Sequence, residues 1–247
     1  MSQKIEISRA GAVLRLVFNR PEKKNALDRE AYRGLIVALD AAGRDEAVRA
    51  VVFAGAGGDF TAGNDLADFR DFVDKPEAFP ALHFVRAIAA FQKPMVAAVA
   101  GDAVGVGTTL LFHCDLVFAA PQARLRMPFI DLGLVPEAGA SLLVPQRLGM
   151  ARAAQYLLLG EGFSGEEAHR FGLVNGLAPP EGVLDAAMAA AQALAAKPVE
   201  ALLASRRLLR GDPAEILARI DAEAALFARA LSSQETRARL AAFFARK

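Results

Sequence analysis

The chain has 247 residues, of which 54% are hydrophobic and 23% charged, and its 29 basic and 28 acidic residues leave a net charge of +1. This length suits one large α/β domain, or a core domain with a helical addition. The balanced charge gives no field that would recruit nucleic acid. The most apolar run, residues 94–120, contains Asp102, His113 and Asp115, so no membrane span is expected there. The N-terminus lacks the apolar region of a signal peptide, and we expect a cytoplasmic protein.

Cysteine and histidine usage gives little support for a disulfide or a metal site. Cys114 is the single cysteine, which excludes an internal disulfide, and its apolar neighbours predict a packed thiol. The three histidines are scattered without the spacing of metal ligands, so the sequence predicts no metal site.

The first third of the chain alternates predicted strands with loops and helices. Residues 4–9 and 12–18 alternate in polarity and predict a hairpin that turns at Gly11. Asp28 is placed to cap a helix of about fifteen residues, and residues 49–54 predict the next strand. This alternation favours a parallel sheet of βαβ type.

A second glycine loop and a further helix follow. Residues 60–66 form a glycine-containing loop, with a helix expected to begin near Asp65. A polar segment, residues 68–80, then leads to a helix that ends near Phe91.

The run of residues 94–120 combines a buried strand, a glycine loop and a helix N-terminus. We predict the strand at 95–100, the loop at 101–107 and the helix at 108–114. Backbone N–H groups at a helix N-terminus have no helical partner, so they attract negative charge. The alternative is that these glycines only permit close packing.

The second half of the chain is mostly helical. After a short strand at 124–127 and a loop at 128–137, helices are predicted at 138–148, 151–159, 164–170 and 182–196. From Pro198 onward the pattern predicts three amphipathic helices, at 198–210, 213–230 and 234–245. We expect their apolar surface to pack on another subunit or on the core.

Five segments carry a resemblance to a known family. They are NRPEKKNAL at 19–27, FTAGNDL at 60–66, GDAVGVG at 101–107, PFIDLGLVPEAG at 128–139 and GEGFSGEEAHRFGLVN at 160–175. Together they resemble the enoyl-CoA hydratase/isomerase (crotonase) family over nearly the whole chain, and most closely its Δ3,Δ2-enoyl-CoA isomerases. The resemblance implies an α/β fold with a crotonase-like spiral of ββα units at 1–197. It also implies a C-terminal helical trimerisation region at 198–247 and a homotrimer or hexamer.

The resemblance further implies a site for an acyl-CoA thioester, in which coenzyme A is part of the substrate and no other cofactor is needed. Two backbone N–H groups, of Asn64 and Val106, are implied as an oxyanion hole for the thioester carbonyl. The implied contacts to substrate and coenzyme A are Lys24, Ala26, Ala62, Gly63, Asn64, Asp65 and Val106. No nucleic-acid or membrane partner is expected.

The residues at the positions where the family has catalytic acids distinguish between the possible reactions. Hydratases of the family use two glutamates to activate water, and the matching positions here are Thr109 and Phe129. Glu137 matches the position from which some family isomerases transfer a proton; alternatively, it only complements the dipole of the following helix. Asp65 and Asp131 are interpreted as structural. We therefore predict a Δ3,Δ2-enoyl-CoA isomerase; the alternatives are a hydratase-like lyase or hydrolase that uses Glu137 with water, or a catalytically silent acyl-CoA-binding scaffold.

Overall fold

The computed structural model describes residues 4–68 and 79–245, which are built around a six-stranded sheet. Its strand order is β1-β2-β3-β4-β6-β9. The strands are β1 (Ile5–Ala10), β2 (Val13–Phe18), β3 (Ala50–Gly55), β4 (Met95–Val99), β6 (Leu116–Ala119) and β9 (Gly176–Leu177). Only β1 and β2 pair antiparallel, and the other neighbours are parallel, as the alternation of strands and helices predicts.

A smaller sheet lies beside the main one and contains β5 (Ala103–Val104), β7 (Arg124–Arg126) and β8 (Gly162–Ser164). β5 pairs parallel to β7, and β7 pairs antiparallel to β8. Because β5 directly follows the central strand β4 in the chain, it fixes the position of the glycine loop.

The central strands are covered by helices, which explains their continuous apolar sequence. All residues of β4 are buried, and α8 (Val183–Ala195) packs on β3, β4 and β6. Helix α1 (Arg29–Arg44) contacts β1 and β2 and packs against α3 (Pro80–Ala90). Asp28 caps α1 as predicted, because its side chain accepts hydrogen bonds from the next helical N–H groups.

The remaining helices agree with the predicted positions within a few residues. They are α4 (Val106–Leu111), α5 (Ala140–Leu148), α6 (Met150–Leu158), α7 (Gly165–Arg170), α9 (Val199–Arg210), α10 (Pro213–Leu231) and α11 (Gln234–Ala245). Short 3-10 turns lie at Pro21–Lys23, Ile130–Leu132 and Pro180–Gly182.

The predicted bounds of one helix need correction, and four short strands are additional to the predicted elements. Helix α4 begins at Val106 rather than Thr108 and ends before Cys114, because Gly105 adopts a positive φ of 57° and starts the helix at once. Strands β5, β6, β8 and β9 were not predicted separately, since two to four residues are too few to show a period. Of the polar segment predicted at 68–80, residues 69–78 lie outside the described residues.

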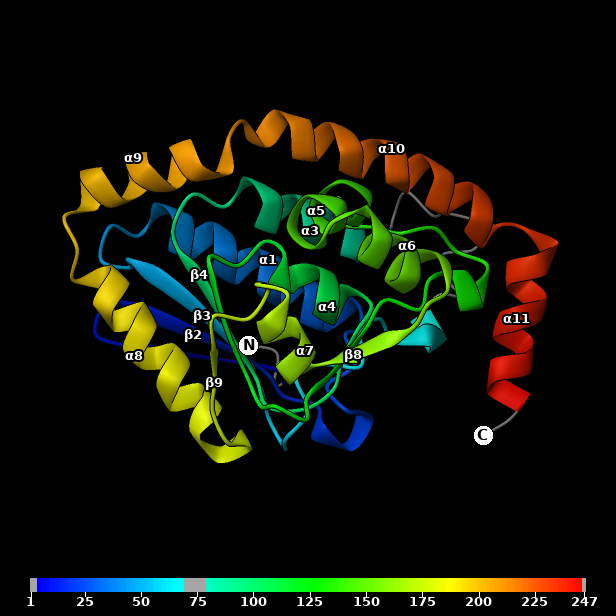
Figure 1. The fold of residues 1–247 in the computed structure, drawn as a ribbon, viewed down its shortest axis with the longest axis horizontal. Coiled ribbons are helices and arrows are strands. Elements are labelled where there is room, and N and C mark those ends of the chain that lie inside the picture. Colours follow the sequence, from blue (N-terminus) through cyan, green and yellow to red (C-terminus); the bar gives the residue numbers. More distant parts are fainter. Residues whose placement is uncertain (1–3, 69–78, 246–247) are drawn as a thin grey trace.

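The three C-terminal helices run along one side of the molecule and turn at α11 (Figure 1). Arg206 of α9 donates to Asp115 at 2.9 Å, and Arg239 of α11 donates to the carbonyl of Asp131 at 3.2 Å. The predicted division at Lys197 falls between α8 and α9, and its status as a domain boundary stays a prediction.

Two further sequence expectations concern single residues and spans. Cys114 is fully buried, as expected for a packed thiol, and burial raises its pKa to about 12. Over the described ranges, no helix has the length and apolarity to cross a membrane.

Candidate active site

Two loops from different parts of the chain are brought into contact beside α4. The Val104 N–H donates to the Thr61 carbonyl at 2.9 Å, and Thr61 forms an isolated parallel bridge with Ala103. Gly63 has a φ of 81°, and a Cβ atom there would lie 2.5 Å from the Val104 carbonyl oxygen. Only glycine therefore permits this approach, which places Asn64 next to the start of α4.

The two amides predicted from the sequence, those of Asn64 and Val106, lie on these adjoining loops. Val106 is the first residue of α4, so its N–H has no acceptor in its own helix. On either side of Asn64, the Gly63 and Asp65 amides donate to Thr61 Oγ1 and the Leu27 carbonyl. Within the described part of the chain, neither the Asn64 nor the Val106 N–H has an acceptor.

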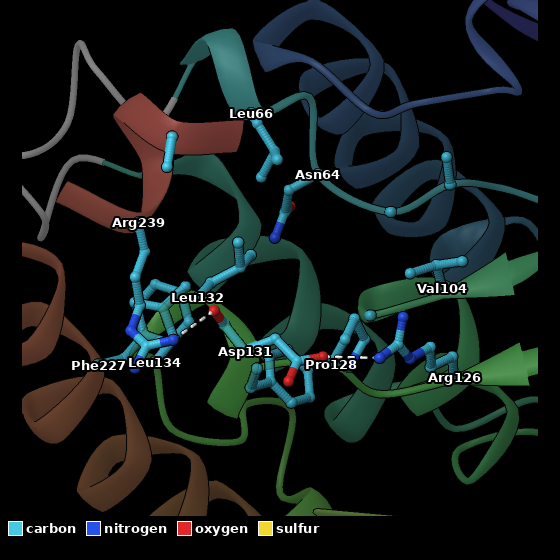
Figure 2. Close-up of a pocket in the computed structure, with 15 residues that line it drawn as sticks. Asn64, Leu66, Val104, Arg126, Pro128, Asp131, Leu132, Leu134, Phe227 and Arg239 are labelled. Atoms are coloured by element: carbon cyan, nitrogen blue, oxygen red, sulfur yellow. Dashed lines mark hydrogen bonds and ion pairs between the residues drawn. The ribbon is translucent and has the colours of Figure 1, made fainter. Parts of the chain in front are cut away.

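A larger cavity of about 620 Å³ opens at the Gly63 loop (Figure 2). Asn64 points its side-chain nitrogen toward this cavity in the view of Figure 2. Arg126 and Arg239 bracket Asp131 at its wall: Arg126 donates to the Asp131 carboxylate at 2.7 Å and Arg239 to its carbonyl. The cavity wall thus carries two cations beside the glycine loops.

A smaller cavity of about 240 Å³ lies between α3 and α10, and Asn64 and Phe227 line both cavities. Among the described residues its wall is almost entirely apolar, and Asn64 and Glu137 are the polar members. The apolar lining residues are Phe79, Ala81, Leu82, Val85, Ala138, Ile220, Ala224, Ala225, Phe227, Ala228 and Leu231. This shape suits an acyl group whose reactive carbon lies near a carboxylate.

Glu137 is the carboxylate in this apolar cavity. Thr109 Oγ1 on α4 donates to Glu137 Oε1 at 2.7 Å. Burial raises the pKa of Glu137 to about 7; the hydrogen bond from Thr109 opposes this shift, and the negative charge of Glu223 adds to it. A carboxyl group with this pKa changes protonation near neutral pH, which suits a group that accepts and returns a proton.

Tyr32 of α1 reaches the same site through its contact with Asn64. Its hydroxyl donates to Asn64 Oδ1, and its ring is 1% exposed. Burial, with a further contribution from the charge of Glu137, raises the pKa of Tyr32 well above its ordinary value. Tyr32 is therefore a neutral donor that fixes the Asn64 side chain.

Of the other residues implied by the resemblance, some line the larger cavity and others do not. Ala62 and Gly63 line the larger cavity with Asn64, whereas Val106 is 1% exposed, and its neighbour Gly105 lines the wall instead. Lys24 forms an ion pair with Asp102 at 3.1 Å.

Ala26 and Asp65 have structural contacts. The Ala26 carbonyl accepts from Arg20 at 2.8 Å, and Asp65 pairs with the same guanidinium at 3.2 Å. Asp65 also accepts from the Ala67 N–H at the start of the next helix, and Asp131 pairs with Arg126. These contacts fit the structural interpretation of both aspartates.

Sequence reasoning missed several residues around the site. Thr109 was considered only as a missing acid, although its hydroxyl is the hydrogen-bond partner of Glu137. Tyr32, Arg126 and Glu223 carry no local motif, and each reaches the site from a separate element. A polar residue on a predicted apolar helix face is the one signal that could have indicated Tyr32 or Glu223.

Comparisons with known proteins agree on the kind of protein. Residues 8–247 match the family described as enoyl-CoA hydratase/isomerase. The chain is 35% identical over 228 residues to enoyl-CoA delta isomerase 2 of Rattus norvegicus, covering 90% of this chain but 58% of the rat protein. It therefore spans little more than half of that relative.

Relatives of similar length carry other names. A probable enoyl-CoA hydratase of Rhizobium meliloti is 33% identical over 96% of this chain and 93% of its own length. The solved structure of Pseudomonas aeruginosa OdaA is 43% identical, has a TM-score of 0.94, and is matched over 98% of this chain and 99% of its own. Both the isomerase and the hydratase activities are thus represented among similar sequences.

Proposed function

The chain belongs to the enoyl-CoA hydratase/isomerase family, and we propose that within it the protein is a Δ3,Δ2-enoyl-CoA isomerase. The observation that carries this proposal is that Glu137 is the one carboxylate among the described residues that line the apolar cavity next to Asn64. At the positions where family hydratases have their two glutamates, this chain has Thr109 and Phe129. Neither side chain can act as a general base toward water.

Glu137 is proposed to transfer the proton. Its carboxylate removes a proton from C2 of a 3-enoyl thioester, and the electron pair delocalises into a dienolate with negative charge on the thioester oxygen. The same group then returns the proton to C4, and the double bond moves from C3–C4 to C2–C3. A single carboxyl group with a pKa of about 7 is sufficient for both steps.

The N–H groups of Asn64 and Val106 are proposed to stabilise the dienolate oxygen. Both lie on the adjoining glycine loops, and neither has an acceptor among the described residues, which supports this role. Loss of one preorganised donor of this kind costs about 2.7–4 kcal/mol in enzymes where it has been removed. The apolar cavity excludes water from the reacting carbons, which favours proton return over hydration.

The larger cavity is proposed to receive the coenzyme A portion of the thioester. Asn64 lines both this cavity and the smaller one, and the wall of the larger cavity carries Arg126 and Arg239, which are placed to attract phosphate groups. The Lys24 carbonyl accepts from the N–H of Ala62, which lines this cavity, and the Lys24 side chain, paired with Asp102, is proposed as a further cation for the phosphate groups.

An ultraviolet assay with two substrates tests the proposed activity. With a 3-enoyl-CoA, the absorbance of the conjugated 2-enoyl thioester should rise; with crotonyl-CoA, absorbance lost through water addition should be slower. Faster hydration would replace the isomerase assignment with a hydratase. Thioester cleavage would indicate a hydrolase, and binding without either reaction would indicate a silent scaffold.

A further inference from the structure

Glu223 links the C-terminal helices to the turn that carries Glu137. The side chain of Glu223 projects from α10, and the residue is 4% exposed. Its carboxylate accepts hydrogen bonds from the Gly139 N–H at 2.6 Å, the Ser141 N–H at 2.8 Å and the Ser141 hydroxyl at 2.6 Å. These amides open α5, so Glu223 supplies the acceptor that the helix N-terminus lacks.

The turn held by Glu223 has an unusual backbone. Ala138 adopts a φ of 59° and Gly139 a φ of 72°, so two consecutive residues lie in the left-handed region directly after Glu137. For alanine this conformation costs about 1–2 kcal/mol and persists only where the surroundings enforce it. On the other side, the buried His113 Nε2 donates to the Ala138 carbonyl at 2.7 Å.

We propose that Glu223 is a positioning residue for Glu137, because its carboxylate fixes the turn between residues 137 and 141 through the Gly139 and Ser141 N–H groups and carries a charge close to the Glu137 carboxyl group. This inference rests on the proposed function, since it assigns the control of the proposed base to the C-terminal helices. It does not require Glu223 to touch substrate, because its carboxylate is occupied by the opening of α5.

The groups that face Glu137 determine how its charge responds to Glu223. Thr109 donates to Glu137 from α4, and Tyr32 on α1 is neutral. His113, behind the turn, is neutral at physiological pH because burial lowers its pKa to about 4. The negative charge of Glu223 raises the pKa of Glu137, so its removal must lower that pKa.

The remaining charged groups around Glu223 are already engaged. Arg219, one turn earlier on α10, approaches the Ser141 hydroxyl at 3.4 Å. From α3, Arg86 forms an ion pair with Asp221 on α10. Asp221 is half exposed, so solvent screens its charge.

Three variants separate charge from geometry. Glu223→Gln removes the charge and the acceptor for the Gly139 N–H. We expect the midpoint of the pH profile of kcat/KM to move to lower pH. At pH values above that midpoint, kcat should drop by about 10–100-fold because the turn is no longer held. Glu223→Asp keeps the charge but shortens the side chain, so kcat should fall while the midpoint stays raised. Asp221→Asn removes a charge from the same helix without contacting the turn and should leave both unchanged.

Infrared titration of the Glu137 carboxyl, assigned by its absence in Glu137→Gln, provides a readout independent of turnover. A lower Glu137 midpoint in folded Glu223→Gln supports the inference even if isomerase activity is absent, in which case the proposed function alone fails. If the Glu137 midpoint is unchanged in Glu223→Gln, or if Asp221→Asn shifts it by the same amount, the inference is overturned. If Glu223→Gln does not fold, the test uses Glu223→Asp instead. A kcat of Glu223→Asp equal to that of the wild type overturns the positioning role.

Discussion

The Thr109 hydroxyl donates a 2.7 Å hydrogen bond to Glu137 Oε1, so the position of one missing hydratase acid now supports the remaining carboxylate. The bond stabilises the ionised form of Glu137 and opposes the rise in its pKa that burial causes. Two helices therefore act on Glu137 in opposite directions, α4 through Thr109 and α10 through Glu223.

Thr109→Val should move the activity profile to higher pH. Valine keeps the shape of threonine but cannot donate, so the pKa of Glu137 rises further and less of the base is ionised at pH 7. The measurement is the acid limb of kcat/KM, with Thr109→Ser as the control that keeps a hydroxyl. An unchanged midpoint in Thr109→Val would show that the hydrogen bond does not act on the base.

Glu137 should also make stability depend on pH. Its folded-state pKa is raised from 4.5 to about 7, so the unfolded chain loses its proton first as the pH rises. The free energy of unfolding should therefore fall between about pH 4.5 and pH 7, by up to about 3 kcal/mol. Chemical denaturation of the wild type and Glu137→Gln at pH 5 and pH 8 checks this prediction. The variant should gain stability relative to the wild type at pH 8. If the difference in free energy of unfolding between the two proteins is the same at both pH values, the raised pKa is contradicted.

The wall of the smaller cavity predicts a limit on acyl length. Ala228 of α10 lines this cavity, so Ala228→Leu should fill part of it. We expect kcat/KM to fall by about 10-fold or more for long 3-enoyl-CoA substrates and to change little for short ones. Ala222→Leu, at an exposed position of the same helix, is the matched control. Equal losses for all chain lengths would place the acyl group elsewhere.

Exposed leucines on α9 support the prediction of an oligomer. Leu208 and Leu209 are 86% and 87% exposed, which is costly for adjacent apolar side chains in water. Light scattering of the full chain should give a mass of three subunits or a multiple of three, and Leu208→Glu combined with Leu209→Glu should shift it toward the monomer. A stable wild-type monomer would contradict the prediction.

The sequence predicted the order of the long elements and the loops of the site, but not the contacts that tune it. Asp28 and the apolar pattern of β4 are local signals, and both elements are confirmed. The joining of the Gly63 loop to Val104 depends on the pairing of short strands, which leave no period in the sequence. Glu223 lies 84 residues from Gly139, and no local pattern on an alanine-rich helix indicates that its carboxylate is buried against that turn.

Glu137→Gln is the sharpest test of proton transfer by Glu137, because glutamine keeps the size of the side chain but cannot accept and return a proton. We expect isomerisation of a 3-enoyl-CoA to slow by about 10²–10⁴ while acyl-CoA affinity changes little. Steady-state turnover and acyl-CoA binding should be measured on the same preparation. Wild-type turnover in Glu137→Gln would show that Glu137 does not transfer the proton.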